Sequence, residues 1–284
     1  MKYTKYLFIT SYLLLLLPKA VKCQVVSGLV KHANTQEVLS YVHIGVAGKN
    51  VGTITNDLGQ FSLDLSSIQG HEKVLISMIG FETISLEKSA LNVSQTLEVY
   101  LHPISYTVPE IEVVAGRGKE IKLGRHRRSK TTSGQSGVAE FGFGGEWGVK
   151  VVYPEESYFL NEISFHTRFN TVDSVLFRLN VYEVVDDRPG NSILLEPIYT
   201  TSYSGDKWIS GNALAQSILI DDDIIVSFEL VRIWYSEQGN NYLFYTHGKG
   251  YPEGRSFSRE SSHDNWQVDQ RAPLAIYISG ITDY

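Results

Sequence analysis

The sequence predicts an all-β protein that contains two antiparallel β-sandwiches. Aromatic residues make up 12% of the 284 residues, and tyrosine alone occurs 17 times, a composition that favours strands. Short apolar segments alternate with Gly, Asn and Asp turns, whereas long apolar patterns with a helical period are scarce. Strands and helices do not alternate along the chain, which argues against a parallel α/β sheet. The length suits two domains of ordinary size.

The first sandwich is expected in residues 24–102, where strand signals follow one another closely. Phe61, Leu63 and Leu65 fall on one face of a strand, because successive side chains point to opposite sides. Asn56–Gly59 has the composition of a turn, since Asn, Asp and Gly tolerate left-handed backbone angles. At least six strands are predicted: Val25–Val30, Tyr41–Val46, Val51–Thr55, Gln60–Leu65, Lys73–Ile79 and Thr96–His102.

Four segments of this region occur in an order that is typical of a known domain. They are Gly28–Val30, Leu39–Val42, Gly52–Phe61 (Gly-Thr-Ile-Thr-Asn-Asp-Leu-Gly-Gln-Phe) and Ile76–Phe81. Through them the region resembles the carboxypeptidase regulatory-like domain, a transthyretin-like β-sandwich. That domain is common at the N-terminus of exported Bacteroidetes proteins, including TonB-dependent receptors. The resemblance implies a non-catalytic module, and the peptidase of the family name is not expected in this chain.

Residues 103–145 are predicted to be a flexible linker. Residues 115–130 carry seven basic side chains and one acidic one, and Thr131–Gly137 and Phe141–Gly145 are rich in Gly and Ser. The basic run is interpreted as solvated chain, with contact to an anionic surface or to the acidic domains as the alternative. Val108–Val114 resembles the segment that leads into the plug of TonB-dependent receptors, but too little chain follows for a large barrel.

The second sandwich is expected in residues 146–284 and is predicted to be of the antiparallel jelly-roll type. In its longest strand, alternate residues from Ile224 to Leu230 share one face, and Trp234 at the strand end is expected in the core. Asp186–Gly190 is a strong turn signal. The predicted strands are Tyr158–Phe165, Phe177–Tyr182, Ile224–Trp234, Tyr242–Thr246 and Ala275–Ile281.

The N-terminus, residues 1–23, is predicted to be a cleaved export signal. Two lysines precede the apolar run Tyr6–Leu17, which Pro18 ends. An uncleaved membrane anchor is the alternative, although the run is short for a span, and no span is expected in the mature chain. Cys23, the only cysteine, is expected to be removed together with the signal peptide. The alternative is a lipidated first residue, but Lys22 stands where a lipobox has a small side chain.

The charge of the chain argues against nucleic acid as a partner. The formal net charge is -6, and removal of residues 1–23 takes away four lysines and no acid, so the mature chain is near -10. Nucleic acid binds surfaces with an excess of Lys and Arg. The expected partner is instead an envelope protein or a glycan, and the sequence does not identify it.

No catalytic residue, metal site or cofactor is predicted. A zinc peptidase needs a His-x-x-Glu pair or two His residues four apart on a helix, and none of the eight His residues fits. Gly134–Gly137 lacks the spacing of a nucleophile elbow, and Phe141–Gly145 is not followed by the helix of a phosphate-binding loop. Asp221–Asp223 is interpreted as a solvated turn rather than a Ca²⁺ site, because consecutive side chains in a turn diverge.

A glycosidase would need two carboxylates at a fixed separation across a cleft. The second half of the chain supplies glutamates, but the sequence does not show which of them lie close together. No pair is chosen from Glu183, Glu196, Glu229, Glu237 and Glu253.

Aromatic residues of the second half supply the candidate ligand-binding side chains. Trp208, Tyr251 and Trp266 lie in polar, Gly-containing neighbourhoods that are typical of exposed loops. Aromatic rings on a sandwich can stack on sugars, but they can equally fill its core. The three residues are therefore a speculative site, and the core remains the alternative.

These observations predict a non-enzymatic, exported binding or adaptor protein of the cell envelope. The periplasm, the outer membrane and the cell surface are all compatible with an export signal. The first alternative is a carbohydrate-binding protein that acts through the second sandwich. The second alternative is an uncharacterised hydrolase, which rests only on the polar and aromatic richness of residues 146–284.

Overall fold

The fold was obtained as a computed structural model, which describes residues 24–91, 95–105, 118–135, 143–237, 241–249, 255–269 and 274–282. The predicted signal peptide and Cys23 lie outside these residues. In the described residues, regular structure is almost entirely β, with two short 3-10 helices, η1 (Lys88–Ala90) and η3 (Leu214–Gln216), so the all-β prediction is confirmed. No helix among them has the length and apolar character to cross a membrane.

The N-terminal module is a sandwich of two small sheets. One sheet has the order β4-β1-β7, in which β1 and β7 are parallel, and the other has the order β3-β2-β5-β6. Its strands are β1 (Val25–His32), β2 (His43–Val46), β3 (Gly52–Ile54), β4 (Gln60–Asp64), β5 (Lys73–Ser77), β6 (Ile84–Glu87) and β7 (Leu97–Leu101).

The core of this module lies between the two sheets. Phe61, Leu63 and Leu65 are buried on one face, as the alternation predicts. The six expected strands are all present, each within a few residues of its expected ends. The additional strand β6 pairs with β5 and alternates between half-buried and exposed side chains. Such a short, half-exposed edge strand leaves little hydrophobic pattern in the sequence.

The C-terminal sandwich consists of two larger antiparallel sheets. One has the order β13-β12-β17-β10-β19-β20 with β14 beside β12, and the other has the order β8-β21-β11-β18-β9 with β15 and β16 beside β11. Its strands are β8 (Glu120–Gly124), β9 (Arg127–Gln135), β10 (Glu146–Val151), β11 (Tyr158–Asn170), β12 (Ser174–Val185), β13 (Arg188–Ser192), β14 (Ile198–Tyr203), β15 (Trp208–Asn212), β16 (Leu219–Ile220), β17 (Ile224–Trp234), β18 (Leu243–Lys249), β19 (Ser256–Arg259), β20 (Gln267–Asp269) and β21 (Ile276–Thr282).

Aromatic rings fill the centre of the C-terminal sandwich. Phe165 from one sheet stacks on Phe228 from the other, with ring centroids 4.2 Å apart, and Phe177 meets Phe165 edge-on at 4.9 Å. Such contacts between the inner faces of two sheets bury large apolar areas. The turn signal at Asp186–Gly190 also has a structural counterpart. Asp186 and Asp187 have positive φ angles, 49° and 59°, between the paired strands β12 and β13.

The stretch predicted to be a flexible linker contributes two strands to the C-terminal sandwich. Residues 120–124 form β8, which pairs with β21, and residues 127–135 form β9, which pairs with β18. Ile121 and Leu123 on β8 pack against the hydrophobic core. The linker interpretation is therefore wrong for these residues. Polar composition was misleading because edge strands with one solvated face need few apolar side chains.

Trp234 is exposed rather than in the core. Its side chain is 38% exposed, whereas its neighbour Ile233 is buried. The register between β12 and β17 shifts at Phe177. Leu176 pairs with Arg232, but the next residue, Phe177, pairs with Leu230, so β17 has one extra residue between the two partners. The extra residue of this bulge reverses the alternation, so the side chain that reaches the core after it is Ile233.

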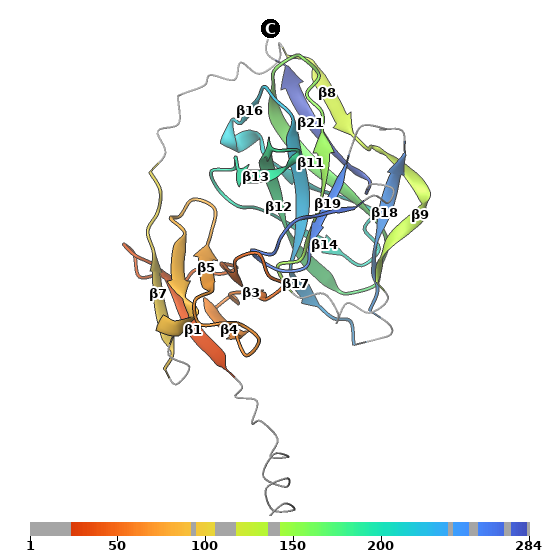
Figure 1. The fold of residues 1–284 in the computed structure, drawn as a ribbon. Coiled ribbons are helices and arrows are strands. Elements are labelled where there is room, and N and C mark those ends of the chain that lie inside the picture. The colour runs from red at the N-terminus through yellow and green to blue at the C-terminus, as the bar shows by residue number, and fades with distance from the viewer. Residues whose placement is uncertain are drawn as a thin grey trace, which may run out of the picture.

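The two modules are in contact through one face of the larger sandwich. Figure 1 shows the N-terminal module, in red to yellow, beside the green-to-blue sandwich. Ile79 of the N-terminal module packs against the hydrophobic core cluster of the C-terminal sandwich. The rings of Tyr41 and Tyr199 meet across the same boundary with centroids 5.6 Å apart. This boundary positions the polar groups described next.

Candidate functional site

The outer face of the sheet that contains β12, β17, β10 and β19 carries a row of four charged side chains. Arg178 on β12 pairs in register with Glu229 on β17. Glu229 is in turn opposite Glu146 on β10, and Glu146 is opposite Arg259 on β19. We call these four residues the charged row. The two glutamates are neighbours on adjacent strands, and each has an arginine on its other side.

The first half of the charged row is joined to the N-terminal module. Arg178 holds Glu229 with two hydrogen bonds, Nε to Oε2 at 2.9 Å and Nη2 to Oε1 at 2.8 Å. Its third nitrogen, Nη1, donates to the backbone oxygen of Tyr41 at 3.0 Å. Nε2 of His43 lies 2.7 Å from Oε1 of Glu229 and also contacts Arg178. Arg178 and Glu229 are fully buried, so the module closes over this ion pair.

The second half of the charged row is satisfied within the C-terminal sandwich. Oε1 of Glu146 accepts hydrogen bonds from Asn180 at 2.8 Å, from Tyr182 at 2.9 Å and from Ser227. Oε2 accepts from Nε of Arg259 at 2.8 Å. Every carboxylate oxygen of the row thus has a hydrogen-bond donor. A general acid or base must reach a proton of its substrate, and these oxygens face protein groups instead.

Burial and charge act in opposite directions on the pKa of Glu229. Burial alone would raise it, but the Arg178 guanidinium and then His43 hold this pKa well below its ordinary value. Burial lowers the pKa of His43, and Arg178 lowers it further. Burial also lowers the pKa of His263 to about 3, with His43 and Arg259 as additional causes. At neutral pH the ionised Glu229 therefore lies beside a neutral His43, whose ring meets the neutral ring of His263 edge-on at 6.0 Å.

Two glycines on neighbouring strands allow the backbones of the modules to meet. Gly45 on β2 pairs with Gly52 on β3, and both face Ser262 of the C-terminal sandwich. A Cβ atom at Gly45 would lie 2.1 Å from the backbone oxygen of Ser262, so no other residue fits without displacement. The backbone N–H of Gly48 donates to the oxygen of His263 at 2.9 Å. Glycine in a strand often marks such a close approach.

The outer face of the other sheet carries a group of aromatic side chains. Trp208 on β15 is opposite His166 on β11, and the two rings meet edge-on with centroids 4.9 Å apart. Tyr277 on β21 meets Trp208 edge-on at 5.0 Å. Nζ of Lys122 on β8 lies 5.7 Å from the Tyr277 ring centroid. We call this group, in which Trp208 and Lys122 are exposed, the open-face cluster.

The structure places two of the three candidate ligand residues, Trp208 and Trp266, on different sheets. Trp208 belongs to the open-face cluster. Trp266 lies on the opposite sheet, where its ring meets Tyr182 edge-on at 5.7 Å and Arg259 lies 4.7 Å from its centroid. Tyr251 lies outside the described residues. Trp266 is thus a packing neighbour of the charged row, and Trp208 is the exposed ring of the pair.

The charged row was missed by sequence reasoning, apart from Glu229 as one of five unselected glutamates. Arg178 and Glu229 stand at outward positions of their strands, where charged residues are ordinary because such faces are usually solvated. Gly45 and Gly52 gave a usable signal, since glycine inside a strand indicates a bulge or a close backbone approach. The sequence did not indicate which backbone would approach them.

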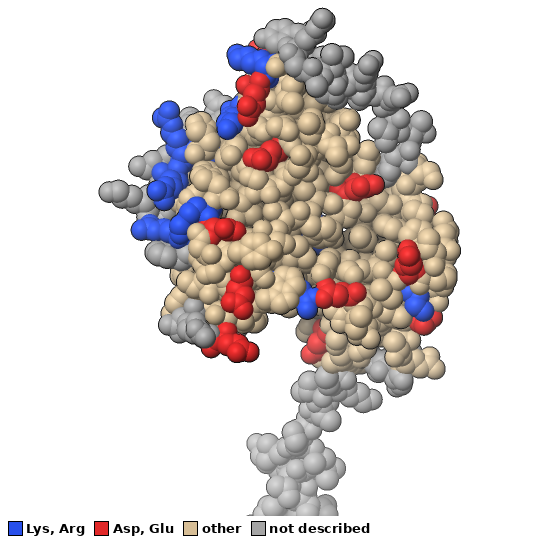
Figure 2. Space-filling view, turned by 180° about the vertical axis from the view of Figure 1, so that it is seen from behind, with Lys and Arg blue, Asp and Glu red and all other residues tan. Residues whose placement is uncertain are grey.

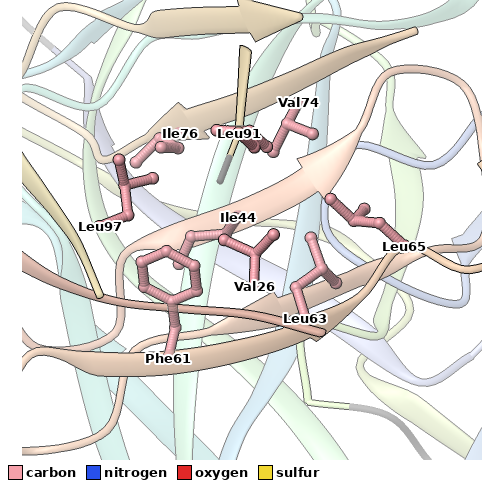
Figure 3. A pocket seen from close by; sticks show the side chains of 9 residues that line it. All are labelled: Val26, Ile44, Phe61, Leu63, Leu65, Val74, Ile76, Leu91 and Leu97. Atoms are coloured by element: carbon pink, nitrogen blue, oxygen red, sulfur yellow. The ribbon is translucent and has the colours of Figure 1, made fainter. Parts of the chain in front are cut away.

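A small cavity inside the N-terminal module is part of core packing. Figure 3 shows its lining side chains, all of them hydrocarbon, from both sheets of the module. Cavities without polar groups offer a ligand no hydrogen bonds that would fix its orientation. Within the described part of the chain, no group of three or more His, Cys, Asp or Glu side chains is placed to hold a metal ion. The lining residues are Val26, Ile44, Phe61, Leu63, Leu65, Val74, Ile76, Leu91 and Leu97.

Comparison with known proteins gives a family for the N-terminal module. Residues 26–114 match the model of the CarboxypepD_reg-like domain. The resemblance seen in residues 24–102 is thereby confirmed for the domain itself, a β-sandwich. The CarboxypepD_reg-like module is the part of the chain that supplies Tyr41, His43, Gly45 and Gly52 to the boundary. No curated protein matches the chain.

Solved structures add no argument. Chains from structures of the Gt and Gx strains of infectious bursal disease virus align with 91% of this chain at 9% identity, and both have a TM-score of 0.26. The chain spans 62% of the Gt-strain chain and 77% of the Gx-strain chain. A TM-score this low carries no conclusion about fold or function.

Proposed function

We propose that the protein is a non-enzymatic, exported binding or adaptor protein of the cell envelope. Its CarboxypepD_reg-like module is a fixed structural part, docked on the C-terminal sandwich. The observation that carries the proposal is the state of Glu146 and Glu229. They are neighbouring carboxylates, yet both are fully buried, and an arginine holds each of them.

The charged row is a structural element in this proposal. Ion pairs that are fully hydrogen-bonded and shielded from water fix the relative position of two surfaces, whether or not they add net stability. The CarboxypepD_reg-like module reaches the row through the side chain of His43 and the backbone of Tyr41. An adaptor that holds two modules at a fixed angle needs such a junction, whereas a hydrolase needs the same carboxylates free.

A turnover assay with matched variants tests this proposal. Purified protein is incubated with pools of polysaccharides and peptides, and wild type is compared with Glu146→Gln and Glu229→Gln. We expect no turnover by any of the three. Turnover by wild type would by itself contradict the adaptor proposal, and its loss in a variant whose thermal unfolding matches that of wild type would show that the row is catalytic.

The export part of the proposal has its own test. The full chain is expressed in a Gram-negative host, and the N-terminus of the protein in the envelope fraction is determined by mass spectrometry. We expect a mature chain that begins at Gln24. A protein that stays in the cytoplasm with residues 1–23 intact would contradict export, and a lipid mass on Cys23 would favour the lipoprotein alternative.

Carbohydrate binding by the C-terminal sandwich is a second candidate function, and the open-face cluster favours it. An exposed Trp beside a Tyr and hydrogen-bonding side chains is a combination that suits a sugar, with its apolar ring face and its hydroxyl groups. Ser164 and Ser210, which are hydrogen-bonded at 2.8 Å, lie on the same face. Ser210 is exposed and supplies a hydroxyl group near Trp208, and the fully buried Ser164 holds it by this hydrogen bond.

A glycan array distinguishes carbohydrate binding from binding to a protein partner. Wild type, Trp208→Ala and Trp234→Ala are applied side by side, since the two Trp side chains are almost equally exposed, 37% and 38%. Glycan binding that Trp208→Ala abolishes and Trp234→Ala leaves intact would support the second candidate. Absence of binding to every glycan would eliminate it and leave a protein partner as the target of the adaptor.

A further inference from the structure

Basic side chains surround the open-face cluster of this acidic protein. The chain has a formal net charge of -6. Nevertheless Lys122 on β8, Arg128 on β9 and Lys207 next to β15 are exposed around the cluster. In Figure 2, Lys and Arg side chains gather along the edge of the C-terminal sandwich, over the region of β8 and β9. A local excess of cations on an acidic molecule attracts anions to that face.

The cations lie close to the aromatic rings. Lys122 lies over Tyr277, and Arg128 and Lys207 are near enough to His166 to lower its pKa, although burial is the larger cause. Nδ1 of His166 lies 2.8 Å from Oγ1 of Thr246, which fixes the ring against the sheet. The cluster is therefore a rigid aromatic surface with cationic groups along its border.

Polar groups on the same face complete the surface. The half-buried Glu162 accepts a hydrogen bond from the fully buried Ser164 at 2.7 Å, and Lys122 has Glu120 3.9 Å away as an exposed partner. Nζ of Lys207 donates to the backbone oxygen of Arg168 at 3.0 Å. Exposed pairs of this kind are weak, so the cations remain available to a stronger anionic partner.

We propose that the open-face cluster binds a glycan that carries anionic groups. A sugar ring lies on the Trp208 side chain, and its carboxylate, sulfate or phosphate groups lie toward Lys122, Arg128 and Lys207. This inference rests on the second candidate function and narrows its ligand class. Charge-assisted hydrogen bonds to these cations supply preference for acidic sugars, while stacking on Trp208 separates the site from a surface that attracts any polyanion.

Polygalacturonate and its fully methyl-esterified form are the probes for the test. The two polymers share the same sugar, and esterification converts each carboxylate into a neutral methyl ester. Binding of the full chain is measured by calorimetry at low and at high salt. We expect polygalacturonate to bind at least about tenfold more tightly than the ester, because the ester loses the charge-assisted hydrogen bonds to the cations. Salt is expected to remove most of this difference.

Three variants locate the binding surface. Trp208→Ala and the double variant Lys122→Gln/Lys207→Gln are each expected to weaken binding about tenfold. Lys73→Ala, an exposed lysine on the CarboxypepD_reg-like module, is the charge control and is expected to bind like wild type. The Gln variants change only exposed side chains, so they test the surface even if Trp208→Ala fails to fold.

Heparin and single-stranded DNA test whether the surface binds other polyanions. Heparin, which carries both sulfates and carboxylates, would support the proposal if it binds in a Trp208-dependent manner. Tight binding of single-stranded DNA with no effect of Trp208→Ala would show a general polyanion surface and overturn it. Equal binding of polygalacturonate and its ester would also overturn it, but would leave carbohydrate binding standing. If no glycan of any charge binds, the second candidate function itself fails.

Discussion

The outer faces of the two large sheets of the C-terminal sandwich differ in what covers them. On one face, Arg178, Glu146 and Glu229 are fully buried beneath the CarboxypepD_reg-like module and the segment around Ser262. On the other, Trp208 and Lys122 are exposed. Both faces consist of the outward residues of alternating strands, so strand pattern alone does not separate them.

The role of an outward side chain depends on whether another part of the protein covers it. A charged residue under a second module must be paired, because desolvation without a partner is costly. A polar or aromatic residue on an open face carries no such requirement and is available to a ligand. We accordingly propose a structural role for the charged row and a binding role for the open-face cluster.

Removal of Glu229 is expected to have the largest effect on stability. Glu229→Ala leaves the guanidinium of Arg178 buried without its bidentate partner. Breaking a buried pair in this way costs about 3–5 kcal/mol. Denaturant unfolding followed by tryptophan fluorescence measures the change.

Glu162→Ala on the open face is the matched control. Glu162 accepts one hydrogen bond, from Ser164 at 2.7 Å, and its loss is expected to cost about 1 kcal/mol or less. Equal costs at Glu229 and Glu162 would show that the CarboxypepD_reg-like module does not shield the charged row, and the contrast between the two faces would fail.

Acid is expected to destabilise the junction between the modules. The pKa of His43 and that of His263 are lowered in the folded protein, His263 to about 3, from an ordinary value of 6.5. The unfolded chain therefore takes up protons first as the pH falls below about 6.5, and stability is lost from there toward pH 3. Glu229 adds a loss below about 4.5, because its folded pKa is lowered too. One pKa unit corresponds to about 1.4 kcal/mol, so we expect His263 alone to account for a loss of about 3 kcal/mol between pH 7 and pH 4, to which His43 adds.

Histidine variants show how much of this pH-dependent loss of stability comes from each face of the C-terminal sandwich. His166 on the open-face sheet also has a pKa lowered to about 4, so it contributes to the same loss. The double variant His43→Gln/His263→Gln is expected to flatten most of the profile, and His166→Gln a smaller part. Unfolding curves at closely spaced pH values give the answer. A double variant with the slope of wild type would rule out the junction as the acid-sensitive element.

The sequence was sufficient for the fold and insufficient for the contact between the modules. Alternation placed Phe61 and Phe228 in their cores, and the turn at Asp186–Gly190 was found from its residues alone. These features depend on local pattern. Arg178, Glu229 and His43 meet only because three separate segments converge, and no local pattern encodes that convergence. The same holds for Trp208, whose neighbours Tyr277 and Lys122 are distant in the chain.

Introduction of one methyl group at Gly45 is expected to have an intermediate effect. The added Cβ would lie 2.1 Å from the oxygen of Ser262, so Gly45→Ala forces the backbones of the two modules apart. Overpacking of this kind costs about 1–3 kcal/mol. Gly70→Ala is the control, because its nearest contact would be an ordinary 3.6 Å to Ser89. If both substitutions prove neutral in thermal unfolding, the close backbone contact does not exist in solution.

The exposed ion pair between the modules is expected to have the smallest effect. Arg232 and Asp57 form a salt bridge at the rim of the same boundary, with side chains 36% and 48% exposed. Water and salt screen such pairs, so Asp57→Asn is expected to cost only about 0.2–1 kcal/mol, and less in 1 M salt. A double-mutant cycle with Arg232→Gln isolates the pair from the stacking of Arg232 on Trp234 at 4.7 Å. A coupling as large as that of the buried Arg178–Glu229 pair would mean that the rim, rather than the charged row, holds the modules together. A small coupling energy would mean that the junction is stabilised mainly by its buried contacts, where the CarboxypepD_reg-like module excludes water from the charged row.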